Sequence, residues 1–243
     1  MLHRNNIETV IFDLDGTLRH NVPSADETQF NFAVSLGISN SPECHRRGAQ
    51  WAHRYWAQSE ELAQDIEGFD RLEKPFWENY CTRYFMALGV IKGEASDLGP
   101  KLAQRMEEGY NPQSQVHPED FTTLGFLREA GYKVGLVSNR TNPCNEELQE
   151  LGLSPYLDFA YVAAEVGAWK PDPAIFNRAF EVTGSSPERI VYIGDNYYAD
   201  ILGAKNAGIT PILLDPRGIF PDAECAVIRS LGELTEILNP QHQ

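Results

Sequence analysis

The sequence has few of the features that mark several protein classes. Its four cysteines form no Cys-x-x-Cys pair, so we expect reduced structural thiols rather than a zinc ribbon or a redox dithiol. No uninterrupted apolar stretch reaches membrane-spanning length. The first residues contain neither a long apolar segment nor a small-residue cleavage site. We therefore expect a soluble, cytoplasmic protein.

Positive charge is scarce. The 243 residues include 20 lysines and arginines against 35 aspartates and glutamates, for a formal net charge of -15. This balance argues against nucleic acid or an anionic membrane surface as the main partner. An enzyme of this composition that acts on anions needs a locally positive site, built from a metal ion, a lysine or backbone N–H groups.

Short apolar runs rich in β-branched residues recur along the chain, and most end in a polar residue. The periodicity predicts buried strands at residues 9–12, 133–137, 159–162, 190–193 and 211–214. Strands that are apolar on both faces are typical of a parallel sheet covered by helices. Helical patterns at 119–130, 172–183 and 199–207 each stop at a glycine. The sequence thus predicts a doubly wound α/β core, with ligands bound beyond the carboxyl ends of the strands.

Residues 19–115 interrupt this alternation. They contain no convincing strand, but helical segments are expected from the capping box Ser24–Glu27 and at 42–66, 72–88 and 94–108. We predict that residues 1–18 and 116–243 form the core domain and that 19–115 form an inserted helical domain. Turn-rich hinges are expected at 19–23 and 111–118.

Two groups of residues in this insert leave alternatives open. The aromatic residues favour helix packing, although a substrate pocket is also possible. The basic stretch favours a solvated helix face over a contact with a substrate anion. His117, near the second hinge, is interpreted as structural. The aromatic set is Trp51, Tyr55, Trp56, Phe76, Trp77, Tyr80 and Tyr84, and the basic set is Arg46, Arg47, His53 and Arg54.

The segment Asp13-Leu14-Asp15-Gly16-Thr17 directly follows the first strand. In extended backbone Asp13 and Asp15 face the same space, and Gly16 permits a tight turn. Two nearby carboxylates resist ionising together unless a cation lies between them or one stays protonated. This arrangement suits one carboxylate as a nucleophile and the other as an acid/base. An Asp-Gly turn is the alternative, but it leaves Asp13 unexplained.

Asp195 follows the fourth predicted strand, and Asp200 lies five positions later at the start of a helix. Their oxygens suit a hard cation such as Mg²⁺. The alternative is that they are a turn residue and a favourable charge at a helix N-terminus.

Ser138, Asn139 and Lys170 supply a hydroxyl, an amide and an ammonium at strand ends or in a strand-to-helix loop. Such donors can hold phosphoryl oxygens, with help from helix N-termini. Each of these residues alone also fits an ordinary turn or a solvated lysine. Their common location at one sheet edge favours the functional interpretation.

Taken together, these motifs resemble those of the haloacid dehalogenase-like hydrolase superfamily, in the family's order and over nearly all of the chain outside the insert. The position of the insert is similar to that of the family's C1-type helical cap. The matching segments are Asp13 to Thr17, Ser138-Asn139, Lys170-Pro171-Asp172-Pro173 and Asp195 to Asp200.

The resemblance implies a phosphatase in which Asp13 is the nucleophile and Asp15 the general acid and base. It also implies that Mg²⁺ is bound by Asp13, the Asp15 backbone carbonyl, Asp195 and Asp200. Substrate phosphoryl oxygens would be held by Thr17, Ser138, Asn139 and Lys170, and the Lys170–Pro171 bond is expected to be cis.

Asp15 separates the phosphatase branch from the dehalogenases of the superfamily, which usually carry a bulky aromatic residue at that position and use no Mg²⁺. A phosphosugar mutase has the same motifs and stays open, as does a catalytically silent binding protein with this fold. The expected partner is a small phosphorylated metabolite.

Overall fold

The computed structural model describes residues 7–239 of the protein. The chain divides into two compact units. One is formed by the chain up to His20 and from Gln115 onward, and the other by Asn21–Ser114. The predicted domain boundaries, after residues 18 and 115, lie close to these division points. We call the two parts the α/β unit and the helical unit.

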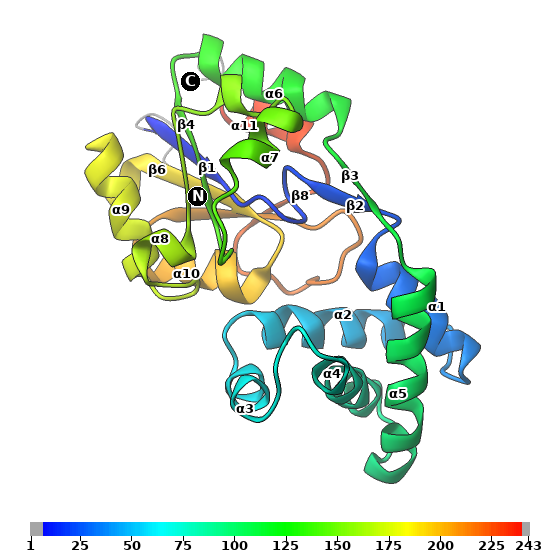
Figure 1. Ribbon diagram of the computed structural model, residues 1–243. Helices are drawn as coiled ribbons and strands as arrows, with labels where there is room; N and C mark the ends of the chain where they lie inside the picture. The colour runs from blue at the N-terminus through cyan, green and yellow to red at the C-terminus, as the bar shows by residue number, and fades with distance from the viewer. Residues whose placement is uncertain (1–6, 240–243) are drawn as a thin grey trace. The chain divides into compact units, whose positions relative to one another are not determined.

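The α/β unit contains a six-stranded parallel sheet in the order β5-β4-β1-β6-β7-β8 (Figure 1). Sheet order reverses on either side of β1, which is the place where doubly wound sheets bind ligands. The predicted fold class is therefore confirmed. The strands are β1 (Thr9–Phe12), β4 (Lys133–Ser138), β5 (Phe159–Val162), β6 (Ile190–Gly194), β7 (Thr210–Leu214) and β8 (Ala226–Ile228).

Alternate residues of β1 enter two separate cores. Val10 and Phe12 pack with side chains of α6, α7 and α11 on one face, where Figure 1 shows these helices together. Ile11 packs with side chains of α8, α9 and α10 on the other face. This alternation follows from the two-residue period of a strand. The helices are α6 (Pro118–Glu129), α7 (Asn145–Glu150), α8 (Ala163–Val166), α9 (Ala174–Thr183), α10 (Leu202–Asn206) and α11 (Leu234–Ile237).

Two local features of this unit differ from expectation. The predicted helix 199–207 is a π-helical turn, η4 (Tyr197–Ile201), followed by α10. The short strand β8 was not predicted, because three residues carry too little periodicity. Three 3-10 turns complete the unit: η2 (Ser154–Tyr156), η3 (Pro187–Arg189) and η5 (Leu231–Glu233).

The helical unit is built from α1 (Ala25–Ser35), α2 (Pro42–Trp56), α3 (Glu60–Gly68), α4 (Lys74–Ala87) and α5 (Lys92–Gly109). The single helix predicted over 42–66 is wrong. The chain breaks at Gln58, whose φ of 58° is left-handed. Ser59 then caps the next helix by accepting a hydrogen bond from the Leu62 backbone N–H, because a serine hydroxyl satisfies an N–H that the helix leaves free.

The aromatic residues of the insert form most of the core of the helical unit. Tyr55, Phe76, Tyr80 and Tyr84 are buried, which supports the packing interpretation. Within the same unit there is also a cavity of about 550 Å³, whose lining includes Gln29, Trp56, Lys74, Trp77, Tyr80 and Met106. The aromatic residues therefore pack the core of the unit, and Trp56, Trp77 and Tyr80 also line a cavity.

The basic stretch on α2 makes contacts inside the helical unit. Arg46 pairs with Glu43, and the Arg47 guanidinium donates to the Leu88 carbonyl. Arg54 lies 3.6 Å from a Glu61 carboxylate oxygen. These contacts support the interpretation of this stretch as a helix surface.

The two segments that join the units pair as a short ribbon of β2 (His20–Val22) and β3 (Gln113–Gln115). The sequence predicted turns in these two segments and no strand in the insert. Both predictions missed the pairing of β2 with β3. No helix among residues 7–239 is long and apolar enough to span a bilayer. All four thiols are free, and three of them are buried.

Candidate active site

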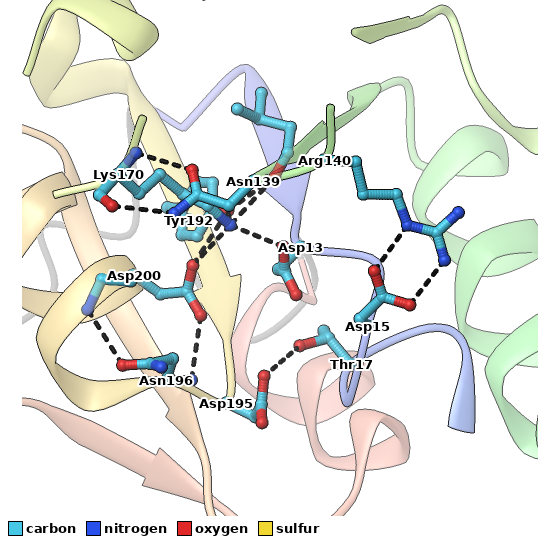
Figure 2. A network of polar contacts seen from close by, with 12 residues as sticks. Asp13, Asp15, Thr17, Asn139, Arg140, Lys170, Tyr192, Asp195, Asn196 and Asp200 are labelled. Atoms are coloured by element: carbon cyan, nitrogen blue, oxygen red, sulfur yellow. Dashed lines mark hydrogen bonds and ion pairs between the residues drawn. The ribbon is translucent and has the colours of Figure 1, made fainter. Parts of the chain in front are cut away.

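The first strand delivers Asp13 into a buried polar cluster at the carboxyl edge of the sheet (Figure 2). Its side chain is only 8% exposed. One carboxylate oxygen lies 2.5 Å from the ammonium nitrogen of Lys170. Burial raises the pKa of Asp13 to about 7, an effect that the Lys170 charge opposes and that Asp200 and Asp15 reinforce. The cluster thus has more negative charge than Lys170 balances.

Lys170 is a fully enclosed cation with four acceptors. Its ammonium donates to Asp13, to Asp200 Oδ1 at 2.7 Å, to the Tyr192 hydroxyl at 2.9 Å and to the Val137 carbonyl at 3.2 Å. Although burial disfavours the charge, Asp13 and Asp200 raise the pKa of Lys170 above its usual range. The lysine therefore stays charged at neutral pH.

Asn139 positions the segment that carries this lysine. Its amide nitrogen donates to the Lys170 carbonyl at 2.8 Å, and its amide oxygen accepts from the Lys170 N–H at 2.7 Å. These two bonds occupy the side chain that the motif assigns to substrate binding. The Lys170–Pro171 peptide bond is cis.

Asp13, Asp195 and Asp200 bring carboxylate oxygens within 4.8 Å of one another. Burial, together with the charges of Asp200 and Asp13, raises the pKa of Asp195 well above its usual range. Three crowded carboxylates against one ammonium fit a hard divalent cation, which prefers oxygen ligands and offsets their repulsion.

The two oxygens of Asp200 are already engaged. Oδ1 accepts from Lys170, and Oδ2 accepts from the Asn196 N–H at 2.9 Å. The Thr17 hydroxyl lies 3.5 Å from Asp195 Oδ1. Asp13 and Asp195 are therefore the carboxylates best placed to bind a cation directly, and Asp200 suits a contact through water.

Two glycines allow these carboxylates to approach the backbone. Gly16 has a φ of 91°, and a Cβ on it would lie 2.5 Å from an Asp195 carboxylate oxygen. A Cβ on Gly194 would lie 2.4 Å from the Asp200 carboxylate. Any side chain at either position would displace the carboxylate beside it, which is why the motifs need glycine here.

Asp15 has a different environment from Asp13, two residues away. Its carboxylate accepts two hydrogen bonds from the Arg140 guanidinium, both at 2.6 Å, and a third from Arg19 at 3.0 Å. Glu147 pairs with both arginines. The Asp15 side chain is 41% exposed. One carboxylate is thus buried beside a lysine, and the other is held by a guanidinium fork at the surface of the unit.

The structure brings every predicted site residue to the carboxyl edge of the six-stranded sheet. Thr17 and Ser138 are buried there at the ends of their segments. Tyr192 and Arg140 were not singled out from the sequence. Arg140 directly follows the predicted pair Ser138-Asn139, which was the available signal. Tyr192 lies inside a strand and carries no local mark of its contact with Lys170.

The sequence matches the family model of the haloacid dehalogenase-like hydrolases over residues 7–208. This match covers most of the chain. It includes the helical insert and all the polar clusters described above.

Individual relatives agree with that match. The chain is 29% identical over 223 residues to a glyceraldehyde 3-phosphate phosphatase of Methanopyrus kandleri, covering 90% of this chain and 88% of the relative. It is 24% identical to a phosphoserine phosphatase of Thermus thermophilus, covering 95% and 98%. The crystal structure of a phosphatase of the same family from Thermococcus onnurineus is similar, with a TM-score of 0.55 and 26% identity, over 96% and 98% of the two chains.

Proposed function

The chain belongs to the haloacid dehalogenase-like hydrolase family, and from this premise we propose that it is a Mg²⁺-dependent phosphatase acting on a small phosphorylated metabolite. Relatives named as phosphatases of small phosphorylated compounds support the reaction class. No single substrate follows from them, because their named substrates differ. The net charge of -15 also fits a site whose positive charge comes from a lysine and a metal ion.

One observation carries the proposal: two carboxylates two residues apart have opposite surroundings. Asp13 is buried against the Lys170 ammonium, whereas Asp15 is partly exposed beside Arg140. Different environments allow two carboxyl groups of the same chemical type to take different roles, and Lys170 together with a bound cation would keep Asp13 in the ionised form that a nucleophile requires.

In the first step a carboxylate oxygen of Asp13 attacks the phosphorus atom of the substrate. The bond between phosphorus and the leaving oxygen breaks, and an acyl phosphate forms on Asp13. Asp15 is assigned the role of the general acid, whose carboxyl group in its acid form would give a proton to the leaving alkoxide. General acid help of this kind contributes about 10²–10⁴ in rate. Lys170 offsets the repulsion between the incoming phosphate and Asp13.

In the second step a water molecule attacks the phosphorus atom of the acyl phosphate. Asp15, now a carboxylate, takes a proton from that water. The bond between phosphorus and the Asp13 oxygen breaks, inorganic phosphate leaves, and both carboxyl groups return to their starting states. Ser138 is assigned to the phosphoryl oxygens, with Thr17 beside Asp195. Asn139 acts through Lys170, whose segment it holds.

Asp13, Asp195 and the Asp15 backbone carbonyl would hold the Mg²⁺ ion, with Asp200 as an indirect ligand. When bound, this ion neutralises charge on the phosphoryl oxygens and on the three carboxylates. The helical unit serves as a cap that excludes bulk water in this proposal.

The test is phosphate release from p-nitrophenyl phosphate and from a panel of phosphorylated metabolites, with and without Mg²⁺. Asp13→Asn should reduce turnover by roughly 10⁴-fold or more, because it removes the nucleophile itself. The matched control is Asp222→Asn, an exposed aspartate of the same unit, which should keep full activity.

Two results would contradict the proposal. Substantial turnover by Asp13→Asn would exclude Asp13 as the nucleophile. Conversion of a sugar monophosphate to its isomer in the presence of the sugar bisphosphate, without phosphate release, would identify a mutase.

A further inference from the structure

A second cluster of metal-ligand side chains lies outside the site described above. It consists of His20, the first residue of β2, with His117 and Asp120 at the start of α6. Ligand atoms of the three side chains lie within 4.8 Å of one another. His20 Nε2 is 4.0 Å from Asp120 Oδ2, and the two imidazole rings are stacked with centroids 4.2 Å apart. Segments almost 100 residues apart in sequence thus place two imidazoles and a carboxylate together.

The two ligands at the start of α6 are joined by a local hydrogen bond. The Asp120 carboxylate accepts it from the His117 N–H at 3.2 Å, as part of the capping box of this helix. This bond fixes the orientation of the carboxylate. Asp120 is only 2% exposed, while His117 lies at the surface. The cluster is therefore partly fixed and also accessible to an ion.

The charge states of these side chains are compatible with a bound metal ion. Burial raises the pKa of Asp120 to about 7 and lowers the pKa of His20 to about 4, with His117 contributing to the latter. A neutral imidazole is the form that binds a metal. A carboxylate whose ionised form is disfavoured by burial gains most from a cation beside it.

We propose that His20, His117 and Asp120 form a second metal site, which binds a divalent transition ion of the Zn²⁺ class. Two nitrogens and one oxygen suit such an ion, whereas Mg²⁺ prefers oxygen ligands alone. Binding turns the exposed His117 ring out of its stack with His20, because the lone pairs of two nearly parallel rings do not converge. Water fills the open coordination position.

The position of this site gives it a structural consequence. The division points of the chain fall at His20–Asn21 and Ser114–Gln115, so the ligands flank both segments that join the two units. A metal ion there cross-links the start of β2 to the start of α6 across the end of the β2–β3 ribbon. Since Arg19, the residue before His20, pairs with Asp15, the same ion also braces the loop that carries Asp15. The inference does not depend on the proposed function.

Titration with Co²⁺, in excess Mg²⁺, tests the proposal by visible absorption spectroscopy of the full-length protein. A four-coordinate site with nitrogen ligands gives visible d–d bands, whereas an all-oxygen octahedral site absorbs weakly. We expect such bands at one equivalent, displaced by Zn²⁺. His117→Asn and Asp120→Asn should each weaken Zn²⁺ binding by more than about 100-fold, since outer-shell partners alone change metal affinity about 10–100-fold.

Two variants serve as matched controls and should keep the bands. His45→Asn removes another imidazole that lies 3.0 Å from a carboxylate, that of Asp26, and stacks on a ring. Asp195→Asn removes a ligand of the proposed Mg²⁺ site. Far-ultraviolet circular dichroism checks folding. If Asp120→Asn fails to fold, His117→Asn decides the matter, because its side chain is exposed. Absence of the bands, their survival in His117→Asn, or their loss in Asp195→Asn would overturn the proposal.

Discussion

Each unit buries a carboxylate beside a cation, and the two clusters differ in charge balance. In the helical unit Asp65 is only 3% exposed, and Arg83 donates two hydrogen bonds to it at 2.8 and 3.1 Å. The Tyr55 hydroxyl donates a third at 2.9 Å. In the α/β unit one ammonium, Lys170, contacts the buried carboxylates of Asp13 and Asp200, and a third carboxylate, that of Asp195, has an oxygen within 4.8 Å of theirs.

The difference is consistent with a structural ion pair in the helical unit and with the proposed catalytic role of the pair in the α/β unit. Asp65 has one cationic partner and a hydroxyl, so its charge is compensated within the unit. The α/β cluster keeps an excess of negative charge, which costs free energy unless a cation binds. Proteins tolerate such an imbalance mainly at sites that bind ligands or metals. Breaking each pair should therefore give different results.

Among the three variants that compare the two clusters, Lys170→Met should have the largest effect. Turnover should fall by roughly 10³-fold, because in the proposed mechanism the Lys170 ammonium stabilises the charge of the transferring phosphoryl group beside Asp13. The free energy of unfolding without Mg²⁺ should fall by about 3–5 kcal/mol, since the buried carboxylates of Asp13 and Asp200 lose their cationic partner. Mg²⁺ should restore part of this loss, because removal of the ammonium leaves more uncompensated negative charge and Lys170→Met should bind Mg²⁺ more tightly than the wild type, by about 1.4 kcal/mol for each tenfold in affinity. Urea unfolding with and without Mg²⁺ measures both values, and equal losses under both conditions would contradict the assignment of the metal site.

Arg83→Met tests the balanced pair. It should lower the free energy of unfolding by about 2–3 kcal/mol, at the low end for breaking a buried pair because Arg83 is partly exposed and Tyr55 stays bonded to Asp65. Mg²⁺ should not recover this loss, since the pair lies outside the carboxylate cluster. Unfolding curves recorded as for Lys170→Met allow a direct comparison. Recovery by Mg²⁺ would show that the two clusters are not independent.

Arg140→Gln should have the smallest effect, about tenfold in kcat for an alkyl phosphate, a fraction of what a general acid contributes. The guanidinium fork sets the position of Asp15, and glutamine cannot reproduce it. The loss should be smaller with p-nitrophenyl phosphate, whose leaving group needs less protonation. Arg128→Gln, which breaks an exposed pair with Asp158 in the same unit, is the control and should leave kcat unchanged. Equal losses on the two substrates would show that Arg140 does not act through Asp15.

Much of the α/β unit could be predicted because its signals are local. Apolar runs predicted β1, β4, β5, β6 and β7 to within one residue, since a buried parallel strand is apolar at nearly every position. Polar residues at the ends of these runs predicted the edge at which Asp13, Ser138 and Asp195 gather. The order of the strands was not predicted, because right-handed crossovers alone leave several orders possible.

Other features depend on contacts that are distant in sequence. In the sequence Tyr192 cannot be distinguished from the apolar residues of its strand. In the structure its hydroxyl contacts Lys170, Asp200 and the Val137 carbonyl. The sequence predicted that Asn139 binds the substrate. The structure shows that its amide group is hydrogen-bonded to the backbone of Lys170. The break at Gln58 was missed because α2 and α3 both have helical periodicity, and the left-handed residue between them is not glycine.

The sequence by itself determined the α/β class, the helical insert and the residues that carry the motifs, because periodicity and turn chemistry act over a few neighbouring residues. Only the tertiary structure decided which carboxylate lies beside which cation. It alone pairs Asp13 with Lys170 and Asp15 with Arg140, and it brings His20 to His117 and Asp120. Burial and distance set the strength of a charge interaction, and neither is defined until distant segments pack together.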